Sequence, residues 1–358
     1  MTGLRSAGLT VRDDLTGIEG YHSPQVSVDV RLNTNESPYP PPDGWRQAFL
    51  DELATVAFHR YPDRQAVALR QALAAFHGVR PDQVFAANGS NEVLQALCLA
   101  YGGSGRTAAV FEPTYALHSH IARITGTDVV VGVRTEDFGV DLAAVRRLLV
   151  RSDASLTFLC SPNNPTGTVD APSTTAAVVA AAPGLVVVDE AYGQFTPRSA
   201  IGQVADGVNL VVVRTFSKTW ALAGLRLGYC VAPAEVVAAL DAVTLPYHLD
   251  AATQAGGRLA LGFRVEMEAR VATLVAERDR LAAALGELPV DTWPSGANFI
   301  LFRPRLRAGA AVWADLVERS VLVRDCSTWP GLEGCLRVTV GTPEEDDAFL
   351  TALAQVCR

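Results

Sequence analysis

The chain has 358 residues, of which 49% are hydrophobic and 19% charged, so it can bury a large core and is not expected to be disordered. A net charge of −8 without basic runs argues against nucleic acid or a membrane surface as partner and favours a small molecule. The cysteines lack zinc or redox spacing, the apolar stretches are too short to span a membrane, and no secretory signal is expected from residues 1–15. These features predict a cytoplasmic protein with reduced thiols.

The predicted elements begin after an irregular segment. Residues up to about Asp43 are rich in Pro, Asn and Ser and predict an N-terminal arm that leads into a first helix near 45–58. Near-continuous apolar strands, separated by helical stretches rich in Ala and Leu, are typical of a parallel sheet covered on both faces. The strands are expected at 84–87, 107–111, 129–133, 156–160, 185–189 and 210–214.

The last third of the chain predicts a second, smaller domain. Residues 251–285 favour a long helix, interrupted near Gly256, Gly257 and Gly262, that leads into strands near 299–302, 321–324 and 336–340. We therefore expect an α/β protein with an arm over 1–43, a large domain over 44–250 and a small α+β domain over 251–358.

A lysine stands where one predicted strand ends. The strand that starts at Leu210 runs into Ser217 and Lys218, and Arg226 follows eight residues later. Ligands in open α/β sheets bind beyond the carboxyl ends of the strands, so this lysine could hold a phosphorylated aldehyde. The alternative is a solvated loop lysine.

An acidic residue stands at the end of another predicted strand. Residues 185–188 deliver Asp189 and, shortly after it, Tyr192 to the same edge of the sheet. A carboxylate there is costly to bury without a positive partner, and a protonated pyridine nitrogen would be one. The alternatives are that Asp189 caps a turn or binds a metal ion.

Two loops complete the candidate site. Residues 161–167 contain two prolines, which favour a rigid loop that can fix the amide of Asn164. Ser90 and Asn91 lie between a strand and a helix that is expected to start near Glu92, so backbone N–H groups could bind phosphate there. The alternative is ordinary N-capping by Ser90 or Asn91.

These segments, in this order, resemble the fold type I class I/II aminotransferases, and within them the histidinol-phosphate aminotransferases. The resemblance covers nearly the whole chain. It implies a large, mostly parallel seven-stranded sheet, a smaller α+β domain, pyridoxal 5'-phosphate as cofactor and a homodimer with shared active sites. The segments that carry it are 31–38, 61–63, 88–92, 113–115, 161–167, 189–192, 217–218 with Arg226, 298–299, and 335–337 with Thr339.

The resemblance also implies roles in cofactor binding. Lys218 would carry the cofactor as a Schiff base and act as the general base, and Asp189 would pair with the pyridine nitrogen. Asn164 and Tyr192 would bond the phenolic oxygen, while Tyr115 would stack on the ring. The other expected cofactor contacts, mainly at the phosphate, are Ser90, Asn91, Ser217, Arg226 and, from the neighbouring subunit, Tyr61.

Substrate recognition is expected from the second domain. Alternation along 336–340 puts Arg337 and Thr339 on the face opposite the apolar residues. By the resemblance, Arg337 would bind the α-carboxylate of glutamate, and Arg324 with Tyr21 would bind the phosphate of histidinol phosphate. A surface salt bridge is the alternative for Arg324. The expected substrate contacts are Tyr21, Asn35, Tyr247, Arg324 and Arg337.

The expected reaction is ping-pong transfer of an amino group between histidinol phosphate and 2-oxoglutarate in histidine biosynthesis. The first alternative is an aromatic amino acid aminotransferase acting on phenylalanine, because Asn91 and Trp220 depart from the commoner family pattern and Trp220 could reshape the pocket. A decarboxylase of the same fold and a cofactor-binding sensor without turnover are the others. The arm over 20–42 is a candidate lid.

Overall fold

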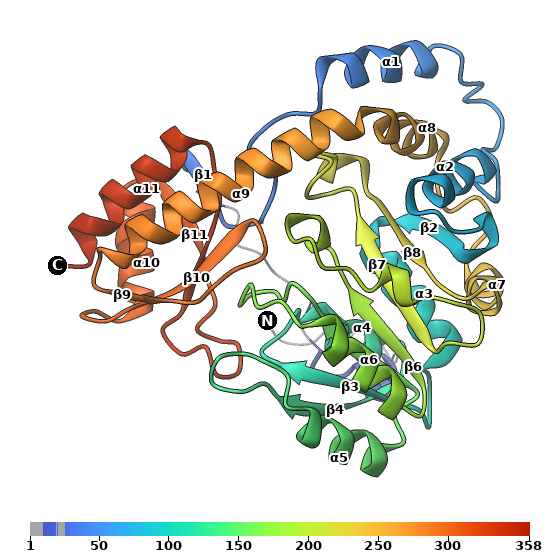
Figure 1. Ribbon diagram of the computed structural model, residues 1–358, viewed down its shortest axis with the longest axis horizontal. Coiled ribbons are helices and arrows are strands. Elements are labelled where there is room, and N and C mark those ends of the chain that lie inside the picture. Colours follow the sequence, from blue (N-terminus) through green and yellow to red (C-terminus); the bar gives the residue numbers. More distant parts are fainter. Residues whose placement is uncertain (1–9, 19, 21–25) are drawn as a thin grey trace.

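The computed structural model describes residues 10–18, 20 and 26–358, and two β-sheets lie side by side in it (Figure 1). In the larger sheet, β3 to β7 pair in parallel and β8 is antiparallel to both its neighbours. The α/β class and the mostly parallel seven-stranded sheet are confirmed. The strands of this sheet, in spatial order, are β2 (Val84–Asn88), β8 (Leu227–Val231), β7 (Leu210–Thr215), β6 (Leu185–Asp189), β5 (Leu156–Cys160), β3 (Thr107–Glu112) and β4 (Asp128–Val133).

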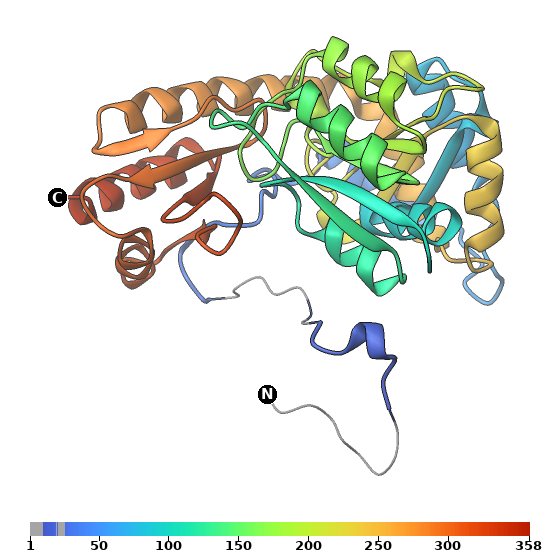
Figure 2. The ribbon, with the colours of Figure 1, turned by 90° about the horizontal axis from the view of Figure 1, so that it is seen from below.

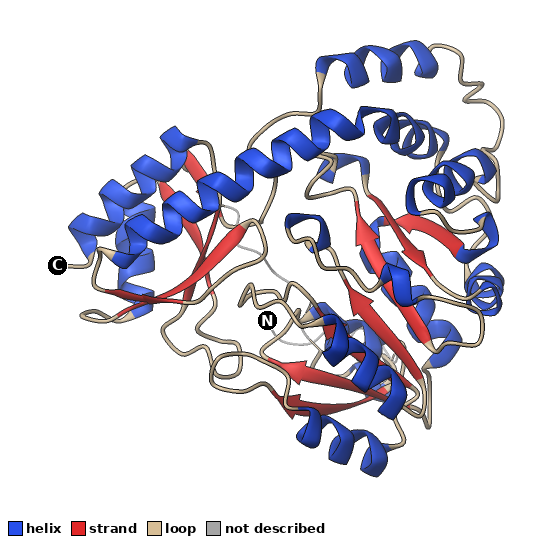
Figure 3. Ribbon diagram, in the orientation of Figure 1, coloured by secondary structure: helices blue, strands red, loops and turns tan. Residues whose placement is uncertain are grey.

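Helices cover both faces of the larger sheet (Figure 3). Val186 and Val188 of β6 enter one core, and Val187 between them enters the other. Because both faces are apolar, the strands read as continuous hydrophobic runs and their polar residues stand at the carboxyl ends. The first core is closed by α2 (Val67–His77), α5 (Leu142–Ser152), α6 (Pro172–Ala181) and α8 (Ala251–Ala260), and the second by α3 (Gly89–Tyr101), α4 (Leu117–Ile124) and α7 (Ala234–Val243).

The smaller sheet has the order β1 (Val30–Leu32), β11 (Val321–Asp325), β12 (Leu336–Thr339), β10 (Phe299–Pro304) and β9 (Val290–Thr292). It packs against α9 (Arg264–Gly286), α10 (Gly309–Glu318) and α11 (Pro343–Val356), and α9 runs along one side of the molecule between the two sheets. Figure 2 shows the short 3-10 helix Asp13–Leu15 on the side opposite α9. Among the described helices, none combines the length and apolarity that crossing a membrane requires.

The N-terminal arm is less irregular than its sequence predicts. Val30 to Leu32 form β1, which pairs in parallel with β11 from Val30 opposite Val321. The first helix, α1 (Asp43–Leu53), follows a Pro-rich run. A three-residue strand has no periodicity to detect, so only the pairing with a distant strand reveals it; β9 was missed for the same reason. The arm therefore supplies the edge of the smaller sheet.

Glycines in the long helical stretch do not all interrupt it. The predicted break is confirmed around Gly262, in the 3-10 turn Leu261–Phe263, but Gly256 and Gly257 lie inside α8. A Cβ at Gly257 would come 2.1 Å from Leu227 Cδ2 of β8. Gly257 permits close packing of α8 against the sheet, and Gly256 permits close packing against Leu225 and Phe49. The prediction of a break at these two glycines was wrong.

Candidate active site

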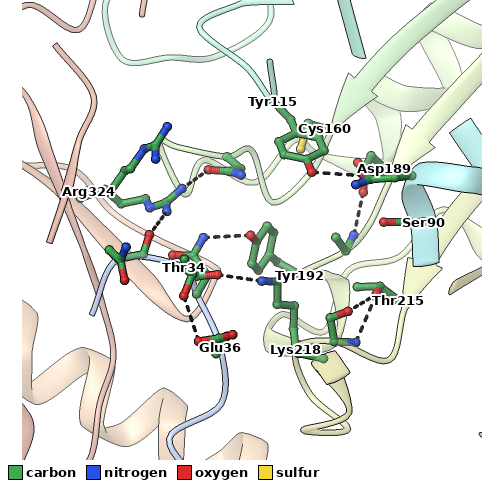
Figure 4. Close-up of a pocket in the computed structure, with 18 of the residues that line it drawn as sticks. Thr34, Glu36, Ser90, Tyr115, Cys160, Asp189, Tyr192, Thr215, Lys218 and Arg324 are labelled. Atoms are coloured by element: carbon green, nitrogen blue, oxygen red, sulfur yellow. Dashed lines mark hydrogen bonds between the residues drawn. The ribbon is translucent and has the colours of Figure 1, made fainter. Parts of the chain in front are cut away.

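A cavity of about 370 Å³ lies where the carboxyl ends of β5, β6 and β7 face the smaller sheet (Figure 4). Residues 33–36 of the arm form part of its wall. Most of the residues predicted from the sequence meet here, although they come from segments far apart in the chain. Those that line the cavity are Asn35, Ser90, Asn91, Tyr115, Asn164, Asp189, Tyr192, Ser217, Lys218, Arg226, Arg324 and Arg337.

Three predicted residues are not placed in this cavity. Tyr61 and Tyr247 do not line it; their rings stack on each other with centroids 4.5 Å apart, and they are 80% and 41% exposed. Tyr21 lies outside the described residues. The cavity of one chain is therefore lined by all the expected cofactor contacts except Tyr61, which was expected from the neighbouring subunit.

Lys218 is largely enclosed and its amine faces the cavity. Its Nζ donates to the carbonyl oxygen of Thr34 at 3.0 Å. Burial and the nearby charge of Arg337 lower the pKa of Lys218 to about 8, while Glu36 acts in the opposite direction. The alternative of a solvated loop lysine was wrong.

The amino-acid composition singles out Lys218 more strongly than its position at the end of a strand does. Lys218 is the only lysine in the chain, and the other 29 of its 30 basic residues are arginines. A guanidinium stays protonated and cannot replace a nucleophilic amine. Lys218 is therefore the only side chain in the sequence that offers a primary alkyl amine.

The lowered pKa leads to a testable pH dependence. Only the neutral amine can attack an aldehyde, so the rate at which the cofactor-free protein binds an aldehyde at Lys218 should rise about tenfold per pH unit and level off above about pH 8. Stopped-flow absorption measures this rate against pH. A rate that still climbs towards pH 10, where an ordinary lysine titrates at about 10.4, would contradict the assignment.

Asp189 is buried and held by two partners. Its Oδ2 lies 3.0 Å from His118 Nε2, and its Oδ1 accepts from the N–H of Ala191 at 3.0 Å. His118 stacks on Phe158. The turn cap that was the alternative for Asp189 is thus present, and no cluster of three or more His, Cys, Asp or Glu that could hold a metal occurs among the described residues.

His118 was missed as a functional residue. It comes from α4, 71 positions before Asp189, and nothing in its spacing indicates the pairing. An imidazole that shares a hydrogen bond with this carboxylate fixes its orientation towards the cavity. The sequence offered no signal for the contact.

Arg337 and Asn164 meet at the opposite wall. Arg337 is buried and donates to Asn164 Oδ1 and, at 2.8 Å, to the carbonyl oxygen of Asn33. The rigid loop expected around Asn164 is held by its neighbour Asn163, which donates to the Pro113 carbonyl at 2.9 Å and accepts from the Thr114 hydroxyl at 2.9 Å. Because Asn164 Oδ1 is engaged, its Nδ2 is the group left to face a ligand oxygen.

The helix α3 and the segment after Lys218 form a cradle for an anion. The helix starts at Gly89 and not near Glu92, so Ser90 lies inside the first turn and the N-capping alternative was wrong. Arg226 donates to Ser217 Oγ at 3.4 Å, and a Cβ at Gly89 would come 2.7 Å from Arg226 Nη2. Backbone N–H groups, the helix dipole and a guanidinium therefore converge on a space that fits a phosphate.

Two substrate-related expectations have different outcomes. Arg324 lines the cavity and lies opposite Arg337 in the register of β11 and β12, while its guanidinium carbon is 6.0 Å from the ring centroid of Trp329. Trp220 does not line the cavity; it is buried in the core and stacks on Phe216. The idea that Trp220 reshapes the pocket was wrong, because its ring points into the packed side of the sheet.

Comparison with known proteins agrees with this geometry. A sequence profile of the family described as aminotransferase class I and II matches residues 27–353. The chain belongs to the class I and II aminotransferases. This aminotransferase is 47% identical to histidinol-phosphate aminotransferase of Frankia casuarinae over 97% of the chain and 90% of the relative. It is also 47% identical to that of Thermobifida fusca, over 98% and 96%.

A solved structure shows the same fold. The histidinol-phosphate aminotransferase of Sinorhizobium meliloti in complex with pyridoxal-5'-phosphate superposes with a TM-score of 0.86, covers 92% of this aminotransferase and 91% of its own chain, and is 24% identical. At that identity the likeness shows the fold alone.

Proposed function

We propose that this aminotransferase transfers the amino group of histidinol phosphate to 2-oxoglutarate, with pyridoxal phosphate as cofactor, in the cytoplasmic synthesis of histidine. The observation that carries the proposal is one enclosed amine, Lys218, in a cavity that also holds a buried carboxylate and two register-paired arginines. Curated relatives with 41% to 47% identity over nearly the full chain, all named histidinol-phosphate aminotransferase, support the substrate.

The residues fit the cofactor as the sequence implies. Bound pyridoxal phosphate supplies an aldehyde and a protonated ring that accepts the electrons released from the substrate carbon. Asp189 would hold the proton on the ring nitrogen, and Tyr115 would lie against the ring face. Asn164 Nδ2 and the Tyr192 hydroxyl would donate to the phenolic oxygen. Lys218, with a pKa of about 8, would move the substrate proton near neutral pH.

The substrate anions would bind the smaller sheet. Arg324 and Arg337 stand opposite each other on β11 and β12, so two guanidinium groups face the same ligand. The planar guanidinium suits both carboxylate and phosphate. This pair would accept the carboxylates of glutamate in one half reaction and the phosphate of histidinol phosphate in the other.

Steady-state kinetics with two amino donors test the substrate. The value of kcat/KM for histidinol phosphate should exceed that for phenylalanine, and Arg324→Gln should lower the first about 10- to 100-fold, as expected for a lost charged hydrogen bond. The same variant should leave phenylalanine nearly unaffected. Arg305→Gln, an exposed arginine outside the cavity, is the matched control. A preference for phenylalanine would remove the substrate assignment and leave the cofactor assignment intact.

We also propose that the protein is a homodimer in which Tyr61 reaches the cofactor phosphate of the partner subunit. Each protomer would consist of a large domain over 44–250 and a small domain over 251–358. The exposed apolar and aromatic side chains of Leu50, Phe58, Tyr61 and Leu245 support such an interface. Mixing Lys218→Arg with Tyr61→Ala chains should then restore activity, because one hybrid site keeps both residues. Mixed chains that stay inactive, or a monomeric mass in sedimentation, would contradict the shared site.

A further inference from the structure

We propose that Asn35 and Thr339 are positioning residues that orient the Tyr192 hydroxyl and thereby set the proton affinity at the cofactor. The inference rests on the proposed cofactor. It assigns Asn35 a role beside the ring oxygen in place of the substrate contact expected from the sequence.

Three buried groups from distant segments form one hydrogen-bonded chain. Asn35 Nδ2 donates to the Tyr192 phenol oxygen at 2.8 Å, a contact visible as a dashed line in Figure 4. Thr339 Oγ1 donates to Asn35 Oδ1 at 3.0 Å and accepts from the Asn35 backbone N–H at 3.0 Å. Asn35, Thr339 and Tyr192 are 1%, 3% and 4% exposed, so water does not compete for these bonds.

The backbone holds Asn35 in an unusual conformation. Its φ is +56°, in the left-handed region that few side chains other than asparagine tolerate. The side chain of Asn298 fixes the same residue by donating to the Asn35 carbonyl oxygen at 3.2 Å. The amide of Asn35 is thus aimed at Tyr192 by contacts on both sides of its backbone.

The direction of these bonds determines what Tyr192 can do. Because Asn35 supplies the donor, the Tyr192 oxygen accepts there and its own proton must point elsewhere, towards the cavity that Tyr192 lines. Accepting one hydrogen bond also strengthens a hydroxyl as a donor. A stronger donation to the phenolic oxygen of the cofactor lowers the affinity of the adjacent Lys218 nitrogen for a proton.

The chain also joins the two sheets. Tyr192 follows β6 of the larger sheet, whereas Thr339 lies on β12, two residues after the substrate arginine Arg337 and on the same face of the strand. Asn35 is the link between them. A substrate anion bound to Arg337 would therefore act on β12, the strand that carries Thr339 and through it orients Tyr192.

Thr339→Val tests the inference, since valine keeps the shape of threonine and removes the hydroxyl. The readout is the pH midpoint of the visible absorption of bound pyridoxal phosphate, which does not depend on turnover. We expect the midpoint to rise by about half a unit to one unit, the equivalent of one neutral hydrogen bond. Asn35→Asp, which removes the donor with little change in shape, should shift it in the same direction, and Thr339→Ser should keep the wild-type midpoint.

Two comparisons separate orientation of Tyr192 from a general structural effect. Thr157→Val removes another buried threonine hydroxyl, one without a hydrogen-bond partner among the described residues, and should leave the midpoint unchanged. In a Tyr192→Phe background, Thr339→Val should cause no further shift. A further shift of the midpoint in the Tyr192→Phe background, or a wild-type midpoint in both Thr339→Val and Asn35→Asp, would overturn this inference and leave the proposed function intact. A wild-type chain that develops no absorption with pyridoxal phosphate would overturn the proposed function and the inference together.

Discussion

Replacing Lys218 by arginine should abolish amino transfer, with kcat lower by at least about 10⁴-fold, the upper range for loss of a general base. Arginine keeps the positive charge but neither gives up its proton nor attacks an aldehyde. Borohydride reduction of the loaded protein provides a second measurement. Because Lys218 is the only lysine, the wild-type chain should gain the mass of one cofactor on the peptide around residue 218, and the variant none.

A relocated lysine is the matched control. Arg264 forms an exposed ion pair with Glu268 on α9, outside the cavity, so Arg264→Lys can be combined with Lys218→Arg to keep one lysine in the chain. This double variant should remain inactive. Activity that returns with a lysine at position 264, or that survives Lys218→Arg alone, would show that the enclosed amine is not the reacting group.

Replacing Asp189 by asparagine should lower kcat by about 10²- to 10³-fold, the scale observed when one electrostatic contact to a transition state is removed. Asparagine can still accept from the Ala191 N–H, so the local fold should survive. What it cannot supply is the negative charge that would keep the ring nitrogen of the proposed cofactor protonated. Single-turnover kinetics together with the melting temperature separate the two effects.

Glu190 provides the contrast, because it is the next residue, equally buried and equally acidic. Its carboxylate binds Arg214 at 2.6 Å, the Ser199 hydroxyl at 2.9 Å and the Ala200 N–H at 2.6 Å, and it does not line the cavity. Glu190→Gln should therefore cost about 3 to 5 kcal/mol of stability, as for a broken buried pair, and should lower kcat less than Asp189→Asn. Equal losses of kcat in the two variants would contradict these separate roles.

Those parts of the candidate site that depend on local sequence pattern could be predicted. Apolar runs predicted where six strands of the larger sheet lie along the chain, and the polar residues that end them meet in one cavity because the carboxyl ends of parallel strands share an edge. The strand β8, which lies directly after Arg226, was not among the predicted strands.

Contacts between residues far apart in the sequence could not be predicted from local sequence pattern. His118 pairs with Asp189 across 71 positions, and Asn35 bonds Thr339 across 304. Trp220 follows Lys218 closely in sequence, yet its ring packs in the core. In each case the position of a side chain depends on which partner the packed structure brings within bonding distance, and neither periodicity nor residue type encodes that choice.

The sequence by itself thus determined the α/β class, the positions of most strands along the chain and, through its one lysine, the side chain proposed as the reacting amine. These features depend on hydrophobic periodicity and residue chemistry, which act over a few neighbouring residues. The tertiary structure alone decided that β1 joins β11, that His118 supports Asp189, and that Asn35 links Thr339 to Tyr192. Buried polar groups must find partners wherever the fold places them, so these pairings exist only after the two sheets have packed together.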